Sequence, residues 1–226
     1  MASEIEPVAV FRSPLPEKFG LPRQAGLAPN LPGCIELIEP YNDPEALRGL
    51  DGFDYLWLIW GFSLNGSQSG SFKSTVRPPR LGGNERIGVF ASRSPFRPNS
   101  LGLSSVRIKG IDAQHCRIEV LGADLADGTP IYDIKPYVEY ADSHSGIRSG
   151  FVDSRRWEAL QVIIPEDVAT MLGSSTDALR DILSQDPRPQ YQDDAARVYG
   201  LAYGKWNIRF KVDGHTLEVV SAEENR

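Results

Sequence analysis

The sequence predicts a mainly β protein: a sheet that closes into a barrel or near-barrel over residues 1–150, followed by a small α+β appendage over residues 151–226. Three observations support this expectation. The 226 residues include 21 glycines and 17 prolines, an excess of turn-forming residues without an internal repeat. Short apolar runs separated by turn signals fill the first 140 residues. The longer helix-like patterns come only after residue 150.

The first unit is expected to consist of short strands joined by turns. The run from Tyr55 to Trp60 is continuously apolar, which is typical of a strand buried on both faces. A short helix is expected at residues 44–50, because Asp43 is a good N-cap residue and Pro44 suits the first helical position. Many short strands with so little helix between them favour a closed sheet. The other expected strands are Val8–Phe11, Cys34–Ile38, Arg86–Ala91, Leu103–Ile108, Cys116–Leu121 and Ile131–Tyr137.

The second unit begins with helical patterns at residues 165–172 and 178–184. The second of these follows Ser174-Ser175-Thr176-Asp177, which is predicted to form a capping box. Residues 185–189 contain two prolines, so an extended segment is expected to end this helix.

A β-hairpin is predicted at the end of the chain. Apolar and polar residues alternate from Trp206 to Val212, Asp213-Gly214 follows, and the apolar residues Leu217 and Val219 return. Asp-Gly between two alternating runs is the strongest short-range signal for a hairpin turn.

Several chemistries lack the residues that they need. The sequence has no phosphate-binding loop motif and no GxGxxG after a strand. His115, His144 and His215 are not at metal-ligand spacing, so no metal is expected, and His215 is expected to face solvent. Cys34 and Cys116 form no CxxC and are expected to be buried, reduced thiols. Without an 18-residue apolar run or a signal peptide, the expected protein is cytoplasmic and has no membrane partner.

The charge is distributed unevenly along the chain. The formal net charge is −6, which argues against a protein that coats nucleic acid through bulk charge. Residues 71–110, the arginine segment, nevertheless hold eight basic residues and one acidic residue, Glu85. The segment therefore carries +7 and the remainder of the chain −13. Clustered arginines suit phosphate or carboxylate recognition, and the alternative is a solvated basic loop.

Prolines favour the recognition hypothesis, because they fix the backbone that presents the arginines of residues 77–84 and 88–102. Phe96 lies between Arg93 and Arg97. It would either stack on a nucleic-acid base or pack beneath the loop.

The stretch Gly88–Gly102 resembles the signature of the TrmO-type family, the S-adenosylmethionine-dependent tRNA N6-threonylcarbamoyladenosine methyltransferases. The resemblance extends over nearly the whole chain. Residues 63–71 and 142–155 are the least typical parts. The other similar motifs are Arg12-Ser13-Pro14, Lys18–Gln24, Thr75–Asn84, Asp124–Pro130, Asp133–Tyr137, Gln185–Pro189 and Trp206–Arg209.

The resemblance implies a single-sheeted β-barrel that binds S-adenosylmethionine without a Rossmann domain and assembles as a homodimer. It implies methylation of N6 of threonylcarbamoyladenosine on the 3′ side of a tRNA anticodon, so the implied partner is an anticodon stem-loop bearing that nucleoside. It also implies a donor site in which Asp127 accepts hydrogen bonds and Gly128 permits close approach of the backbone. The implied donor-binding residues are Pro22, Arg23, Gln24, Ser63, Arg93, Leu103, Leu125, Ala126, Asp127 and Gly128.

On the acceptor side, Arg77, Arg80 and Arg97 are expected to hold anticodon-loop phosphates or the threonyl carboxylate, together with Lys135.

A general base is sought among Asp133, Tyr137 and His144, which the sequence does not rank. Asp133, Lys135 and Tyr137 alternate along one predicted strand and therefore share a face. That face would line the site, and the alternative is a surface salt-bridge ladder.

Two other functions stay open at this stage. One is a non-catalytic barrel that binds RNA or a nucleotide, which would show no affinity for S-adenosylmethionine. The other is a methyltransferase of the same fold with a small-molecule acceptor, which would turn over the donor without modified tRNA.

Overall fold

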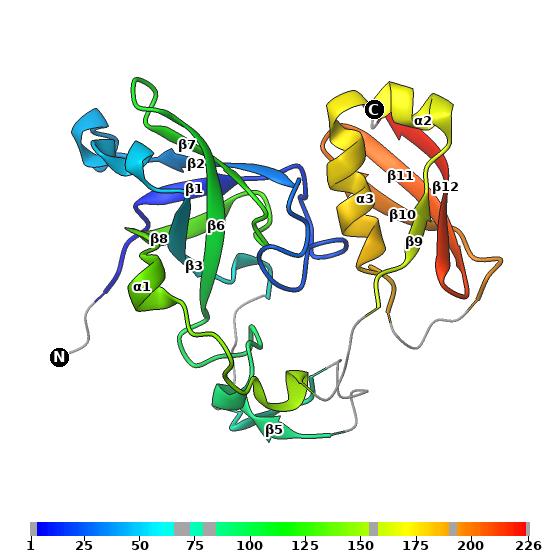
Figure 1. Ribbon diagram of the computed structural model, residues 1–226, viewed down its shortest axis with the longest axis horizontal. Helices are drawn as coiled ribbons and strands as arrows, with labels where there is room; N and C mark the ends of the chain where they lie inside the picture. The colour runs from blue at the N-terminus through cyan, green and yellow to red at the C-terminus, as the bar shows by residue number, and fades with distance from the viewer. Residues whose placement is uncertain (1–3, 66–72, 79–84, 154–157, 190–193, 225–226) are drawn as a thin grey trace.

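The computed structural model describes residues 4–65, 73–78, 85–153, 158–189 and 194–224. Figure 1 shows two units: a barrel that contains the N-terminal strands, and a second sheet, covered by two helices, that contains the C-terminal strands. The mainly β architecture expected from the sequence is confirmed. None of the helices in the described ranges has both the length and the apolar character that a bilayer crossing requires.

The barrel is a single closed antiparallel sheet, with strand order β1-β2-β7-β6-β3-β8 and β8 paired back to β1. Ala9 and Phe11 of β1 point into the core, as do the alternate residues Leu56 and Leu58 of β3. Tyr55 is 43% exposed, so the prediction that this strand is buried on both faces is wrong. Closure already buries the inner face, and the outer face is only partly covered. The barrel strands are β1 (Ala9–Arg12), β2 (Pro32–Leu37), β3 (Tyr55–Gly61), β6 (Leu101–Asp112), β7 (Arg117–Leu121) and β8 (Thr129–Pro136).

The antiparallel registers bring several chain connections to one rim of the barrel. Gly61 at the end of β3 lies opposite Leu101 at the start of β6. Near the same end of β3, Trp60 lies opposite Ile131, close to the start of β8. The end of β7 lies opposite the start of β2, so residues 13–31, here called the rim loop, also begin and end at this rim. Loops from distant parts of the sequence therefore meet there.

The helix expected at residues 44–50 is present as two 3-10 turns, Pro44–Leu47 and Leu50–Gly52. Asp43 is the N-cap residue, because its carboxylate accepts a hydrogen bond from the Glu45 N–H at 2.9 Å. Gly49, with φ at +81°, interrupts the helix between the two turns.

The arginine segment runs through a small two-stranded sheet of β4 (Thr75–Val76) and β5 (Ile87–Gly88) and ends within β6. The strand predicted at residues 86–91 is wrong beyond Gly88, because Val89–Ala91 form a 3-10 turn. The Ser92 hydroxyl donates to the Val89 carbonyl at 2.9 Å and holds that turn.

The second unit is a four-stranded sheet of order β10-β11-β12-β9, in which β9 runs parallel to β12. Helices α2 and α3 pack on it and share its apolar core (Figure 1). The predicted terminal hairpin is present, and Gly214 and His215 form its turn, with Gly214 at φ +53° and His215 exposed. The elements are β9 (Gln161–Ile163), α2 (Glu166–Leu172), α3 (Thr176–Ser184), β10 (Tyr199–Tyr203), β11 (Trp206–Asp213) and β12 (Thr216–Glu224), and α1 (Glu139–Asp142) lies between the units in the sequence.

The capping box predicted at residues 174–177 is wrong. Residues Gly173–Ser175 form a 3-10 turn that runs directly into α3, so Ser175 at the N-cap has helical backbone angles and makes no side-chain capping bond.

The rim loop belongs to the barrel in the sequence but packs against the second unit. Leu15, Ala28 and Leu31 belong to the core of the second unit and are almost fully buried. The Gly204 N–H donates to the Pro14 carbonyl at 2.6 Å.

At the far end of the rim loop, Asn30 donates through its backbone N–H (2.9 Å) and its side-chain amide (3.0 Å) to Asp181 of α3. The C-terminal unit therefore holds the loop that closes the barrel rim.

Both cysteines are free thiols. Cys116 is buried as expected, whereas Cys34 is only half-buried, because its neighbour Ile35 points into the barrel core and Cys34 therefore lies on the outer face of β2. Burial nevertheless raises the pKa of the Cys34 thiol.

Candidate functional site

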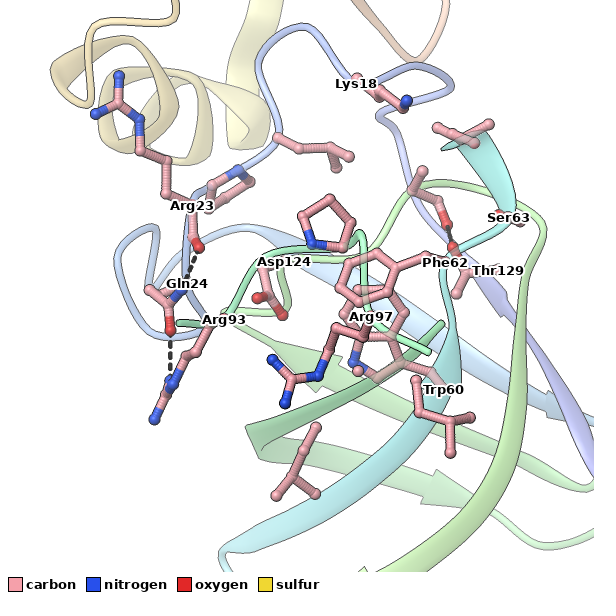
Figure 2. Close-up of a pocket in the computed structure, with 18 of the residues that line it drawn as sticks. Lys18, Arg23, Gln24, Trp60, Phe62, Ser63, Arg93, Arg97, Asp124 and Thr129 are labelled. Carbon is pink, nitrogen blue, oxygen red and sulfur yellow. Dashed lines mark hydrogen bonds between the residues drawn. The ribbon is translucent and has the colours of Figure 1, made fainter. Parts of the chain in front are cut away.

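A pocket of about 470 Å³ lies at this rim, and we call it the rim pocket. The residues that line it come from the rim loop, β3 and the turn after it, the arginine segment including the start of β6, and the connection between β7 and β8 with the first residue of β8 (Figure 2). They are Lys18, Leu21, Pro22, Arg23, Gln24, Trp57, Trp60, Phe62, Ser63, Leu64, Ser92, Arg93, Pro95, Arg97, Leu101, Gly102, Leu103, Asp124, Ala126 and Thr129.

One wall of the rim pocket is a bridge between the rim loop and the arginine segment. The side-chain amide of Gln24 donates to the Arg23 carbonyl at 2.6 Å, and the Arg93 guanidinium donates to the amide oxygen of Gln24 (Figure 2). A single amide thus fixes the position of Arg93 relative to the rim loop.

The floor is aromatic. The rings of Trp60 and Phe62 pack edge to face, with their centroids 4.3 Å apart. Gly102 faces the Trp60 indole so closely that an added Cβ would lie 2.3 Å from Cε2. Trp60 is therefore held between the barrel core and a backbone that carries no side chain.

A hydrogen-bond chain leads from this floor to a carboxylate. The Trp60 indole N–H donates to the Ser104 hydroxyl oxygen at 3.0 Å, and the Ser104 hydroxyl donates to Oδ1 of Asp124 at 2.6 Å. An indole N–H can only donate, so the Ser104 proton is directed to Asp124. Trp60 and Ser104 are buried, and the Asp124 carboxyl reaches the pocket (Figure 2).

Burial raises the pKa of Asp124, because desolvation disfavours the charged carboxylate. The Ser104 hydrogen bond, the backbone N–H groups of Asp124 and Ala25, and the positive charge of Arg93 act in the opposite direction. Among the described residues, no salt bridge includes Asp124. The pocket thus contains a desolvated acid whose hydrogen-bond donors are all neutral.

Many of the residues predicted to bind the donor meet in the rim pocket, although they come from separate parts of the sequence. Those that line it are Pro22, Arg23, Gln24, Ser63, Arg93, Leu103 and Ala126.

The remaining three predicted donor residues lie beside the pocket. Leu125 is buried in the barrel core. The Asp127 carboxylate accepts from the Ser13 N–H at 3.0 Å, and Gly128, at φ +75°, donates to the Phe11 carbonyl at 2.8 Å. This turn therefore fastens the start of the rim loop to the start of β8.

The three candidate bases do not line the rim pocket. Asp133 forms an ion pair with Lys135 at 2.8 Å, and both side chains are about half exposed, as in the alternative of a surface ion pair. Tyr137 packs against the lining residue Trp57, with the ring centroids 5.6 Å apart. His144 is exposed in the connection that follows α1.

The residues predicted to hold RNA are spread along the arginine segment. Arg77 is exposed just after β4, and Arg80 lies outside the described residues. Arg97 lines the pocket and donates to the Ser92 carbonyl at 2.6 Å, so it also supports its own loop. Phe96 is 52% exposed and thus is not packed beneath the loop.

Sequence reasoning missed Asp124, Trp60 and Phe62 as lining residues. The sequence of Trp60 and Phe62 is that of a buried strand, and Asp127-Gly128 carries a stronger turn signal than Asp124. The usable signal was an aspartate three residues after an apolar strand, in a connection and at the head of the motif 124–130.

The rim pocket is suited to a small ligand that is partly flat and apolar and carries both charges. Its rings offer stacking surfaces, its guanidinium groups offer sites for an anion, and Asp124 offers a site for a cation. In the described ranges, no group of three or more His, Cys, Asp or Glu side chains could hold a metal ion.

Comparisons with known proteins identify relatives over the full length. Family models match for the tRNA-methyltransferase O N-terminal domain at residues 10–143 and the TrmO C-terminal domain at residues 158–225. An Escherichia coli protein named tRNA (adenine(37)-N6)-methyltransferase is 38% identical over 231 residues, 97% of each chain. A Pseudomonas aeruginosa relative, provisionally named an S-adenosylmethionine-dependent methyltransferase, is 40% identical over 89% of each chain. A crystal structure of TrmO from Pseudomonas aeruginosa matches with a TM-score of 0.81 at 31% identity, over 99% of both chains.

Proposed function

The chain belongs to the tRNA-methyltransferase O family, and from this premise we propose that it methylates N6 of threonylcarbamoyladenosine on the 3′ side of a tRNA anticodon. Its class is that of its relatives, the S-adenosylmethionine-dependent tRNA adenine-N6 methyltransferases. The threonylcarbamoyl group of the acceptor and its place in the tRNA are the parts that we propose. The observation that supports them is the rim pocket, whose lining includes Arg93 and Arg97 of the arginine segment, since guanidinium groups suit a carboxylate or a phosphate of the acceptor.

The residues of the pocket fit S-adenosylmethionine. The volume of the rim pocket, about 470 Å³, is within the range of small-molecule sites, about 300–1,000 Å³. The donor carries an adenine, two cationic groups and a carboxylate. Trp60 and Phe62 supply apolar rings, Asp124 supplies a negative charge, and Arg93 supplies a positive one.

When bound, S-adenosylmethionine supplies an electrophilic methyl group. The contribution of the protein is to position the reactants, because the bridge through Gln24 and the chain through Ser104 fix two sides of the pocket before a ligand enters.

The accepting nitrogen carries a carbonyl substituent that withdraws its lone pair, so its proton must be lost or shared during transfer. Asp133, Tyr137 and His144 stay the predicted bases, and their positions outside the lining do not rank them.

The reaction is tested by incubating the protein with S-adenosylmethionine and tRNA, followed by mass analysis of the nucleosides. We expect threonylcarbamoyladenosine to gain one methyl group, and tRNA without the threonylcarbamoyl modification to gain none. Donor turnover that does not need modified tRNA would favour a small-molecule acceptor. Donor affinity without any turnover would contradict the methyltransferase assignment for this acceptor, and absence of donor affinity would favour an RNA-binding barrel.

Binding of tRNA is expected to depend on salt and on Arg77, which is exposed after β4. Arg77→Ala should weaken tRNA binding and reduce the slope of log affinity against log salt by about 1, if Arg77 contacts one phosphate. Lys109→Ala is the matched control, because Lys109 belongs to the same basic segment but pairs with Glu119 at 3.1 Å on the barrel wall. Equal slopes for both variants and the wild type would show that Arg77 does not contact phosphate.

We also propose, on the resemblance alone, that two copies form a homodimer in the cytoplasm. Light scattering coupled to size-exclusion chromatography is expected to give twice the mass of the chain, and a monomeric mass would contradict it.

A further inference from the structure

Asp124 is the one acidic side chain among the residues that line the rim pocket in the described ranges. The Ser104 hydroxyl, which accepts from the Trp60 indole N–H, donates to Oδ1 of Asp124. This oxygen therefore has a neutral hydrogen-bond donor. Backbone N–H groups are the other hydrogen-bond donors to Asp124. Neutral donors orient a carboxylate, but they do not neutralise its charge.

A desolvated charge without an opposite charge is unfavourable, and it becomes favourable when a ligand supplies the counter-charge. The cations that line the pocket with Asp124 are Lys18, Arg23, Arg93 and Arg97. Arg93 is held by Gln24, and Arg97 is held by the Ser92 carbonyl. None of the four cations forms an ion pair with Asp124 in the described ranges, although the charge of Arg93 acts on it from beyond salt-bridge distance. The carboxylate can therefore still pair directly with a cation that enters from solvent.

We propose that Asp124 is the residue that pairs with the positive charge of the methionyl part of the methyl donor. This inference rests on the proposed function. Asp124 makes the pocket select a donor that carries the cation, and Ser104 positions the carboxylate for it. The sequence motif had instead indicated Asp127, whose carboxylate accepts from the Ser13 N–H.

The positive charge of the donor lies on the sulfonium sulfur and on the α-ammonium group. Three probes separate these sources. S-adenosylmethionine carries both cations, S-adenosylhomocysteine carries only the ammonium, and 5′-methylthioadenosine carries neither while it keeps the adenosine.

The experiment is titration calorimetry of the full chain and its Asp124→Asn variant with each probe, at about pH 7, where the α-ammonium group of the probes stays largely protonated because an ordinary α-amino pKa is about 8. Asparagine keeps the size of the side chain and an oxygen that can accept from Ser104. We expect the variant to lose at least about 30-fold in affinity for S-adenosylmethionine and less than about threefold for 5′-methylthioadenosine. If the ammonium is the partner of Asp124, the variant will lose as much affinity for S-adenosylhomocysteine as for S-adenosylmethionine. If the sulfonium is the partner, its affinity for S-adenosylhomocysteine will fall as little as its affinity for 5′-methylthioadenosine.

An equal loss for the donor and for 5′-methylthioadenosine would show that Asp124 only supports the pocket, and no loss for the donor would also overturn the inference. Binding of 5′-methylthioadenosine reports that the variant is folded. Ser104→Ala is the second variant. We expect it to lose affinity for the three probes in the same order as Asp124→Asn but by smaller factors, because the carboxylate stays and loses only its orienting hydrogen bond. Wild-type protein that fails to bind S-adenosylmethionine would instead overturn the proposed function.

Discussion

Replacement of Gly102 with alanine is expected to lower the affinity for S-adenosylmethionine at least about tenfold and to reduce the free energy of unfolding by about 1–3 kcal/mol. The added Cβ would lie 2.3 Å from Cε2 and 2.5 Å from Cζ2 of Trp60. Trp60 is 6% exposed and belongs to the barrel core, so its ring has little room to move. A displaced indole would lose its hydrogen bond to Ser104 and free the hydroxyl that orients Asp124.

Calorimetry with the donor and thermal unfolding measure these two effects. Gly88→Ala is the control, because Gly88 lies in the same segment of the chain and an added Cβ there meets nothing within 4 Å. Trp60→Leu should remove the clash, so Gly102→Ala should cost little further stability in that background. Unchanged donor affinity in the single variant Gly102→Ala would contradict the role assigned to Trp60.

The architecture was largely predictable because its signals are local. Short apolar runs bounded by turn signals predicted β1 and β7 within one residue, and alternation of apolar and polar residues predicted β11. The Asp213-Gly214 signal predicted the hairpin. The errors were also local in origin. The helix predicted at residues 44–50 is interrupted by Gly49, whose φ is positive. The capping box predicted at residues 174–177 does not form, because a 3-10 turn runs directly into α3.

The residues of the site could be predicted only where they belong to a motif of the family. Pro22, Arg23, Gln24 and Arg93 came from the family resemblance, and they do line the pocket. Ser104 and Asp124 could not be connected from the sequence, because their hydrogen bond spans 20 residues and depends on the register of β6 and the course of the chain after β7. The bridge between Gln24 and Arg93 spans 69 residues and depends on barrel closure in the same way.

The second large effect is expected in the rim loop, at Gly20. This glycine has φ at +88°, and an added Cβ would lie 2.2 Å from Cδ1 of Leu201. Leu201 is fully buried in the core of the second unit, so the loop and the core cannot both keep their positions. Gly20→Ala is therefore expected to lower the free energy of unfolding by about 1–2 kcal/mol for the left-handed backbone and a further 1–3 kcal/mol, roughly, for the clash.

Gly26→Ala separates these two costs. Gly26 belongs to the same loop and has nearly the same φ, +82°, but an added Cβ there meets nothing within 4 Å. It should show the backbone cost alone, so the difference in unfolding free energy between the two variants measures the contact with Leu201. In a Leu201→Ala background, which empties the space that the Cβ needs, the two substitutions should cost nearly the same.

The same pair of variants tests whether the C-terminal unit positions the pocket. Gly20 precedes the lining residues Leu21 to Gln24 directly, so a loop pushed away from Leu201 carries one pocket wall with it. Gly20→Ala should weaken S-adenosylmethionine binding by about tenfold, since a displacement of about 1 Å already forfeits roughly a quarter to a half of each dispersion contact and misplaces the polar groups of that wall. If both variants bind the donor equally well, the second unit stabilises the fold without shaping the site. If only Gly20→Ala weakens donor binding, the packing of the rim loop on β10 is part of what forms the donor pocket.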